Sequence, residues 1–471
     1  MTVGEVIGKC RELAHPRTHA ERSGTTHPGA LMALAAVLAL DAADRSALGV
    51  LAPALKDAFH IGNGTIGLLA SVFSVVGGVA TVPVGVLTDR TRRVTILVVS
   101  IVLWSAAMGL AAAATTLLVL FVARSALGIL TAAGGPPVTS IVGDLVSPDV
   151  RGRVIGWVKS GELVGAAAGF VVTGAVVAFA SWRAAFAVLA LLGLVVATRV
   201  GRIPEPRRGG EGRPADGHEH LDEPTKLREL VAAEGVEPKP DLVIDENVAE
   251  LPLPAALHYV TRVRTLVMVI AAGALGEFFF TGVQVFGIIF LVDQFDIGAS
   301  TAALVIPAVG AAGFVGVIAG GRLGDWLIER RVLTGRLKVG AWSYLAVAAL
   351  FVPVLVTDTL FVALPFLALA GVFLMAPIAP LEAARLDVVH PQLRGRAESA
   401  RTTARVVAQA TSPLAFGVLS DVLAGGGADG LRAAFLMFLS LLAVSSLLLV
   451  LAAREYPREV ASVQESIVEG S

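Results

Sequence analysis

Long apolar stretches separated by short polar ones run along almost the whole chain. Twelve of them are long enough to cross about 30 Å of hydrocarbon as a helix. In lipid, a helix satisfies its backbone groups within one segment, whereas an open strand cannot. The pattern therefore predicts an all-α integral membrane protein with twelve transmembrane helices. The predicted spans are residues 30–52, 65–88, 94–114, 117–142, 153–180, 182–200, 265–291, 299–322, 338–356, 359–384, 397–424 and 431–452.

The first six spans and the last six are related by an internal repeat. Residues 57–89 match residues 293–325 at an offset of 236, with 11 of 33 positions identical. Residues 144–153 repeat in residues 387–396 at an offset of 243. A duplicated apolar chain is typical of transporters built from two pseudo-symmetric halves. We expect a tail over residues 1–28, a six-helix half over 29–200, a central loop over 201–262, a second six-helix half over 263–453 and a tail over 454–471.

Positive charge is unequally divided between the two sets of loops. Thirteen Arg and Lys residues lie in or beside the loops on one side of the spans, against three on the other. Cytoplasmic loops carry the excess of Lys and Arg. We therefore expect a multi-pass protein of the inner (plasma) membrane with both tails and the central loop in the cytoplasm. The loop is rich in Pro, Gly, Glu and Arg, and a short helix around Leu227–Ala233 is expected there, with disorder over much of the rest.

Composition excludes several other classes of protein. Of the 471 residues, 55% are hydrophobic and only 16% are charged, so most of the surface must face lipid. Cys10 is the single cysteine, which rules out an intrachain disulfide and multi-thiolate metal sites. The chain has no basic cluster with interleaved aromatics and no nucleophile–base pair in its spans. We therefore expect no nucleic-acid partner, no cofactor, no bound metal and no enzymatic activity, and we expect a monomer.

Two loop motifs carry a family resemblance. The run from Gly85 to Arg93 resembles the G-x-L-x-D-R-x-x-R signature of the major facilitator superfamily, and Gly321–Asp325 is a half-copy of it. The resemblance implies alternating access, with Asp89 accepting hydrogen bonds at the N-terminus of the eleventh helix, near Ala397, as an inner gate. The alternative is that these charges only set topology. The expected gating residues are Gly85, Asp89, Arg90, Arg93, Gly321, Asp325, Arg151, Arg153, Arg394 and Arg396.

Ionisable side chains inside the predicted spans are the candidates for binding solute and protons. Each costs roughly 2.5–3.5 kcal/mol at the middle of the bilayer on insertion scales, so each needs a reason to be there. Asp41 and Arg45 are four residues apart and can pair on one helix face, and Asp44 crowds Asp41. The alternative is an ion-pair network that only fixes helix packing. The candidates for a central cavity are Asp41, Asp44, Arg45, Arg124, Glu162, Glu277 and Arg405.

Small residues indicate where helices pack closely. Gly161, Gly165 and Gly169 recur every four residues on the fifth predicted helix. This spacing makes a flat face, which predicts a packing surface rather than a ligand site.

Further motifs bear on the subfamily. Arg124 and Gly128 resemble the R-x-x-x-G element of proton-coupled members of the superfamily. The Asp44-Arg45 pair and the segment 410–421 resemble the Spinster branch, which implies lysophospholipid or sphingosine-phosphate transport. That branch has a Glu where this chain has Thr131, so a proton role would pass to Glu162 or Asp41.

The expected function is secondary active transport. We expect an amphipathic or lipophilic, lysolipid-like small solute, because the spans contain few of the amides and aromatics that sugar sites use. We also expect coupling to protons. The alternatives are a drug/proton efflux antiporter, an organic-anion/proton symporter that uses Arg45, Arg124 and Arg405, and a membrane receptor that does not transport.

Overall fold

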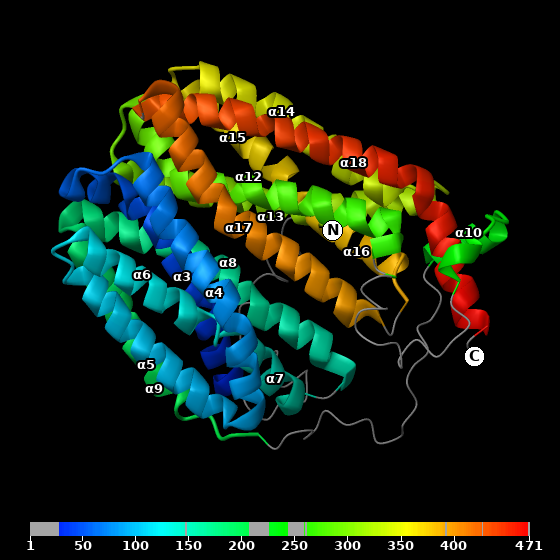
Figure 1. Ribbon diagram of the computed structural model, residues 1–471, viewed down its shortest axis with the longest axis horizontal. Helices are drawn as coiled ribbons and strands as arrows, with labels where there is room; N and C mark the ends of the chain where they lie inside the picture. The colour runs from blue at the N-terminus through cyan, green and yellow to red at the C-terminus, as the bar shows by residue number, and fades with distance from the viewer. Residues whose placement is uncertain are drawn as a thin grey trace, which may run out of the picture. The chain divides into compact units, whose positions relative to one another are not determined.

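The computed structural model describes residues 28–146, 148–206, 226–243, 259, 261–390, 393–425 and 427–469. Every regular element in these residues is helical, which agrees with the predicted all-α class (Figure 1). The chain forms two compact units. Unit 1 comprises Met1–Ile61, Val72–Glu219 and Ala299–Leu304, and unit 2 comprises Gly62–Ser71, His220–Gly298 and Val305–Ser471.

The helices of the first unit pack in close pairs. They are α3 (Pro28–Phe59), α4 (Asn63–Arg90, whose first residues belong to unit 2), α5 (Arg93–Ala112), α6 (Leu117–Thr131), α7 (Gly135–Leu145), α8 (Pro148–Phe179) and α9 (Trp182–Val200). α3 packs along α8, and α5 packs along α9. A Cβ atom on Gly161 would lie 2.5 Å from the carbonyl oxygen of Ala35, and one on Gly169 would lie 2.6 Å from the Cα of Ala43. The predicted glycine packing face is therefore confirmed, because a larger residue would separate α8 from α3.

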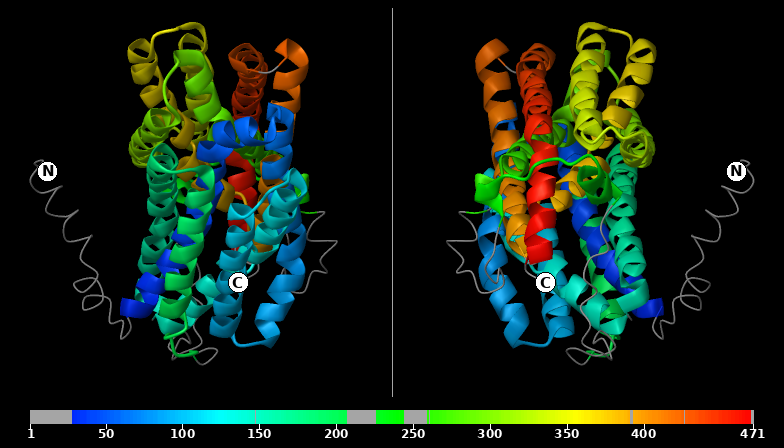
Figure 2. Two further views of the ribbon diagram at one scale, coloured as in Figure 1. Left: turned by 90° about the vertical axis from the view of Figure 1, so that its left-hand side faces the viewer. Right: turned by 90° about the vertical axis from the view of Figure 1, so that its right-hand side faces the viewer.

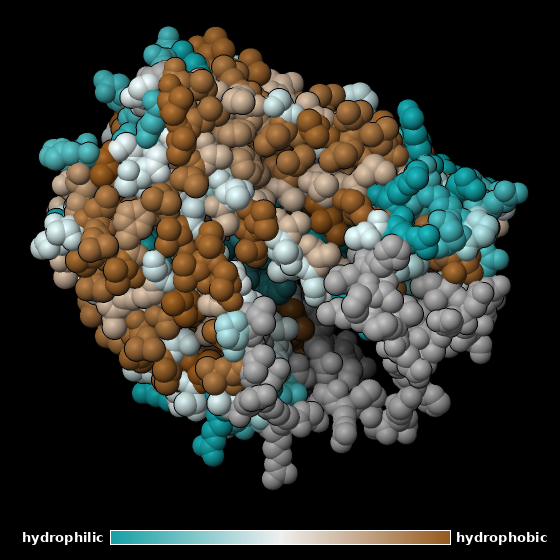
Figure 3. All heavy atoms as spheres, viewed as in Figure 1, coloured by the Kyte–Doolittle hydropathy of each residue, from teal (hydrophilic) through white to brown (hydrophobic). Residues whose placement is uncertain are grey.

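The helices of the second unit surround α12. They are α12 (Arg264–Phe295), α13 (Ala299–Glu329, whose first residues belong to unit 1), α14 (Gly335–Val356), α15 (Leu360–Met375), α16 (Ile378–Asp387), α17 (Arg394–Ala424) and α18 (Gly427–Glu469). α12 packs against both α17 and α18, and α14 packs along α18 (Figure 2). Apolar side chains cover much of the visible surface over α14 and α18, as expected for helices that face lipid (Figure 3).

The described helices account for the predicted spans. By length and composition, ten segments can cross a membrane, and α6 is a shorter apolar helix. α3 completes the set, since it has 32 residues but carries Asp41, Asp44 and Arg45 along its length.

Two predicted spans are each broken into two helices. Residues 117–142 were expected as one helix, but α6 ends at Thr131 and α7 begins at Gly135. Residues 359–384 were also expected as one helix, but α15 and α16 separate at residues 376–377. Pro136 and Pro377 explain the breaks, because the backbone nitrogen of a proline has no N–H to donate to the preceding turn. The two breaks correspond at the 243 offset, so the repeat extends to backbone irregularities.

The predicted short helix of the central loop is confirmed as α10 (Lys226–Ala233), which is followed by the 3₁₀ turn η1 (Pro240–Leu242). α10 packs against α18 (Figure 2). Beside η1, Lys239 forms ion pairs with Glu455 at 2.6 Å and Glu459 at 2.8 Å. Burial alone would lower the pKa of Lys239, but its hydrogen bonds to these two carboxylates raise it above its usual value. The disorder expected elsewhere in this loop concerns residues 207–225 and 244–258, which lie outside the described residues.

Candidate functional site

The first charge cluster lies inside unit 1, around Asp44 of α3. Arg124 Nη1 of α6 forms an ion pair with Asp44 and donates a hydrogen bond to its Oδ1 at 2.8 Å. Trp104 Nε1 donates a hydrogen bond to its Oδ2 at 3.4 Å. Asp44 is completely buried, and Arg124 is 2% exposed. The guanidinium of Arg124 also lies 4.7 Å from the centre of the Phe73 ring, a cation–π arrangement. The pair is thus enclosed by aromatic side chains from α4 and α5.

Gly128 allows α6 to approach α4 at this point. A Cβ atom at Gly128 would overlap the backbone carbonyl of Phe73. Arg124 and Gly128 are one helical turn apart, so the glycine brings α6 close to α4 beside the arginine. The R-x-x-x-G spacing therefore has a local structural role: it positions Arg124 over Phe73.

The second ion pair of this cluster is more open. Arg45 Nη2 lies 3.0 Å from Asp41 Oδ2, as their spacing of four residues predicts. The side chains are 45% and 28% exposed, respectively. Glu162 is exposed on α8, and its charge also acts on Arg45. Asp41, Arg45 and Glu162 therefore form a less buried group of charges next to the Asp44–Arg124 pair.

A small cavity borders Asp41. Its volume is about 30 Å³, and it is lined by Asp41, Thr131 and Trp104 together with residues of α3, α5 and the α6–α7 break. One water molecule needs roughly this much space and a few polar partners. Thr131, at the position where the Spinster resemblance expects a Glu, therefore leaves room for a water next to Asp41. Glu162 does not line this cavity.

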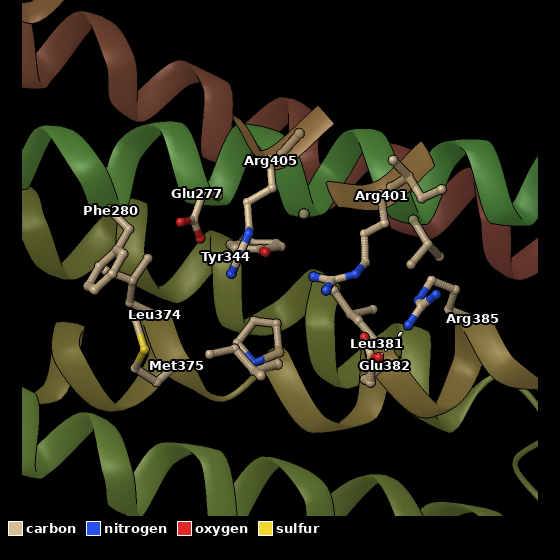
Figure 4. A pocket seen from close by; sticks show the side chains of 17 residues that line it. Glu277, Phe280, Tyr344, Leu374, Met375, Leu381, Glu382, Arg385, Arg401 and Arg405 are labelled. Carbon is tan, nitrogen blue, oxygen red and sulfur yellow. Dashed lines mark hydrogen bonds and ion pairs between the residues drawn. The ribbon is translucent and has the colours of Figure 1, made fainter. Parts of the chain in front are cut away.

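A larger cavity lies inside unit 2, between α12, α14, α15, α16 and α17. Its volume is about 180 Å³. Arg401 and Arg405 extend into it from α17, and Glu277 faces it from α12 (Figure 4). Gln409 Nε2 donates a hydrogen bond to Glu277 Oε1 at 2.5 Å. Within the described chain, Arg405 has no ion-pair partner, whereas Arg401 pairs with Glu398 at 2.5 Å. The predicted residues Glu277 and Arg405 are therefore brought together at one cavity.

One end of this cavity is lined by charged side chains that pair with one another. Arg385 of α16 bonds Glu382 one turn earlier and lies 2.8 Å from Glu398 of α17. Glu398 also holds Arg401. These alternating charges neutralise one another and join α16 to α17. The opposite wall is apolar, with Phe280, Leu374 and Met375 among its residues (Figure 4).

The expected gating residue Arg93 is anchored inside unit 1. It begins α5, is 2% exposed and forms an ion pair with Asp144 of α7. The N–H groups of Arg93 and Val94 donate to the two carboxylate oxygens of Glu205, at 3.0 and 2.9 Å.

The same arrangement recurs in unit 2. Arg336, near the start of α14, forms an ion pair with Asp387 at the end of α16. The Tyr456 hydroxyl donates to Asp387 at 2.6 Å. Arg93 and Arg336, like Asp144 and Asp387, are separated by 243 residues. Arg336 and Asp387 were missing from the expected gating set. Extending the 243-residue repeat back to Arg93 identifies Arg336 and Asp387 as the repeated pair.

The structure describes the side chains of some of the other expected gating residues but not of all. Asp325 is 69% exposed and lies 3.3 Å from Arg336, and Gly321 packs against Ala379 of α16. Arg394 and Arg396 lie partly buried in the first turn of α17. The side chains of Gly85, Asp89, Arg90, Arg151 and Arg153 lie outside the described residues, so their gating role stays a prediction.

Solved structures with the same fold are transporters. A bacterial homologue of the human lysosomal transporter Spinster, in an inward-facing and unoccupied conformation, superposes with a TM-score of 0.76 at 20% identity over 91% of this chain and 97% of that chain. The inward-facing and occupied conformation of a bacterial Spinster homologue gives a TM-score of 0.73 at 18% identity, over 90% and 96% of the two chains. At these identities the likeness establishes the fold.

The chain also resembles several proteins in sequence, over shorter regions. The chain is 24% identical to the hexuronate transporter of Bacillus subtilis over 62% of its own length and 63% of that protein. It is 26% identical to a probable L-galactonate transporter of Escherichia coli over 39% of its length and 40% of that protein. It is 30% identical to protein spinster of Drosophila melanogaster over 39% of its length and 30% of that protein. The chain thus spans less than two thirds of each of these relatives. The sequence model of the Major Facilitator Superfamily matches residues 34–413, most of the chain, and the chain therefore belongs to that superfamily.

Proposed function

We propose that this protein is a secondary active transporter that moves an amphipathic solute with an anionic, lysolipid-like head group by alternating access, coupled to protons. The observation that carries the proposal is the unit 2 cavity, where Arg405 lacks an ion-pair partner within the described chain and faces a mainly apolar lining. A guanidinium recognises phosphate or carboxylate through paired hydrogen bonds, and the apolar wall takes an aliphatic group. A cationic drug would meet two arginines here, which disfavours the drug antiporter.

The size of the cavity limits what it can hold. Sites for drug-sized ligands usually measure about 300–1,000 Å³, whereas this one measures about 180 Å³. It therefore accommodates a head group and the first part of a chain, not a complete lipid. The rest of an amphipathic solute would lie outside it.

Two acids at repeat-related positions are the best candidates for carrying protons. Asp41 and Glu277 are related by the 236 offset, and each lines a cavity within its own unit. Asp44 is held by Arg124 and Trp104, so Asp41 is better placed to exchange a proton with water. Loss of a proton from Asp41 would strengthen its ion pair with Arg45, so the strength of that ion pair would depend on whether Asp41 carries a proton.

A second candidate function is proton-coupled symport of a compact organic anion. The similarity to proteins named as hexuronate and L-galactonate transporters favours it, since both solutes are carboxylates. Arg45, with its exposed guanidinium, would then bind the carboxylate in unit 1. The Spinster-like resemblance favours the first candidate.

The proposal also includes the oligomeric state, the orientation in the membrane and the inner gate. The transporter would act as a monomer in the inner (plasma) membrane, with both tails cytoplasmic. Asp89 would accept hydrogen bonds at the start of α17 when the inner side closes. The other charged residues expected to take part in gating are Asp325, Arg90, Arg93, Arg151, Arg153, Arg394 and Arg396. The direction of transport is open to either import or export.

The test uses the purified protein in liposomes with an imposed pH gradient. A lysophospholipid should accumulate only when the gradient is present, and a hexuronate should compete weakly. Arg405→Gln should raise the KM for the lysophospholipid, while Arg432→Gln, at the start of α18 and outside both cavities, should leave it unchanged. Flux that ignores pH and survives Asp41→Asn combined with Asp44→Asn would refute proton coupling. Accumulation of the hexuronate in place of the lysophospholipid would favour the second candidate.

A further inference from the structure

The N-terminus of α4 is capped by a carboxylate from another helix. Asp421, near the end of α17, accepts hydrogen bonds from the N–H of Asn63 at its Oδ1 (3.1 Å) and from the N–H of Gly64 at its Oδ2 (2.7 Å). The Asn63 amide also donates to Ser420 Oγ at 3.0 Å. The first N–H groups of a helix have no partner within the helix and carry its positive end, so a carboxylate there is doubly favourable.

Glycines allow the two helices to come this close. A Cβ atom on Gly62 would lie 2.6 Å from Asp421 Oδ2, and one on Gly64 would lie 3.0 Å from it. One turn further on, a Cβ at Gly67 would overlap the carbonyl oxygen of Pro413. A Cβ atom at Gly417 would overlap the backbone carbonyl oxygen of Asn63. The contact thus brings the backbones of the two helices directly together along the first turns of α4.

The contact breaks the symmetry of the repeat. At the 236 offset Gly62 corresponds to Gly298, which precedes α13 and has no side chain of its own to cap it. At the 243 offset Asp421 corresponds to Ala178, which has no carboxylate. The start of α13 packs on α8 instead, where a Cβ on Gly174 would lie 2.6 Å from the Cβ of Ala303. Asp421 therefore has no acidic counterpart at the repeat-related position of α8.

Other capping carboxylates in the described chain have a simpler role. Glu205 caps α5, and Glu459 caps α12 through the N–H groups of Arg264 and Thr265. Each lies in the same unit as the whole of the helix that it caps. α4 differs, because its first residues up to Ser71 belong to unit 2 and the rest of the helix belongs to unit 1.

We infer that Asp421 is a positioning residue that latches the first turn of α4 onto α17, and that release of this latch is a step of the transport cycle. The inference rests on the proposed alternating access, in which one half moves against the other. A helix shared by two units must either bend or give up its contacts with one of them when they move. Water replaces the lost hydrogen bonds on release, so the latch is reversible.

The latch can be measured without knowing the solute. Spin labels are attached at Leu68→Cys on α4 and Val422→Cys on α17, both exposed positions, in a Cys10→Ser background of the full chain in lipid nanodiscs. The distance between them gives the ratio of separated to latched molecules. Asp421→Ala should raise this ratio about tenfold, the factor expected for losing a helix cap of ordinary strength. Asp429→Ala is the control: Asp429 is 81% exposed at the start of α18 and lies 3.6 Å from Arg432.

An unchanged ratio in Asp421→Ala, or an equal change in Asp429→Ala, would overturn the inference. A second variant covers the case in which Asp421→Ala does not fold. Asn63→Cys with Ser420→Cys, oxidised to a disulfide, should hold the latch closed, stop flux and allow it again after reduction. Full flux in the oxidised protein would also overturn the inference. If the unaltered protein moves none of the tested solutes, the proposed function fails, while the label distances still decide the fate of the latch.

Discussion

At the scale of single residues, the charges of α3 divide into a structural pair and an exposed pair. Asp44 and Arg124 are buried, and removing one member of such a pair leaves the other charge without compensation. Arg124→Gln should therefore lower the free energy of unfolding by about 3–5 kcal/mol, measured by thermal unfolding in detergent. Asp44→Asn combined with Arg124→Gln should recover part of the loss, because neither charge then remains.

The matched control for this prediction is the neighbouring pair on the same helix. Arg45 and Asp41 are 3.0 Å apart, and their side chains are 45% and 28% exposed. Exposed pairs contribute about 0–1 kcal/mol, so Arg45→Gln should hardly change stability while affecting transport. Equal losses of stability in Arg124→Gln and Arg45→Gln would contradict this division of roles.

At the scale of helices, the contact between α3 and α8 depends on the absence of side chains. A Cβ atom on Gly165 would overlap the backbone of Ala39. Gly165→Ala should cost about 1–3 kcal/mol, the usual penalty for overpacking, measured as a lower midpoint of thermal unfolding. Gly156→Ala is the control on the same helix, because a Cβ atom there meets nothing within 4 Å. If both variants unfold at the same temperature as the parent, the close approach of α3 and α8 has no energetic weight.

The helices were largely predictable from the sequence. In the candidate site, only contacts between residues close together on one helix were predictable. Apolar runs identify helices because lipid permits little else. The breaks at residues 132–134 and 376–377 were missed because averaging hydropathy over a span conceals a few prolines. The Asp41–Arg45 pair follows from spacing on one helix. The partnership of Asp44 with Arg124, 80 residues away, depends on how α3 packs near α6, and spacing carries no such information.

At the scale of the whole molecule, the repeat governs the packing of each unit as well as the sequence. Arg93 with Asp144 and Arg336 with Asp387 tie the start of one helix to the end of another in the same way in both units. Asp421, Asp44 and Arg45 depart from this symmetry, since their repeat-related positions are Ala178, Phe280 and Thr281. Duplicated residues therefore mark shared architecture, and the unpaired ones mark where the two halves do different work.

The orientation of the molecule can be tested through its single cysteine. The positive-inside rule places Cys10 and both tails in the cytoplasm and the loop between α14 and α15 outside. An impermeant maleimide should therefore label Cys10 in inside-out vesicles but not in intact cells. Asp358→Cys in a Cys10→Ser background should label in intact cells, since Asp358 lies in the α14–α15 loop and its side chain is 86% exposed. Labelling of Cys10 in intact cells would reverse the orientation. The ends of α4 and α17 that carry the Asp421 contact would then face the cytoplasm, and the latch would control the opposite gate.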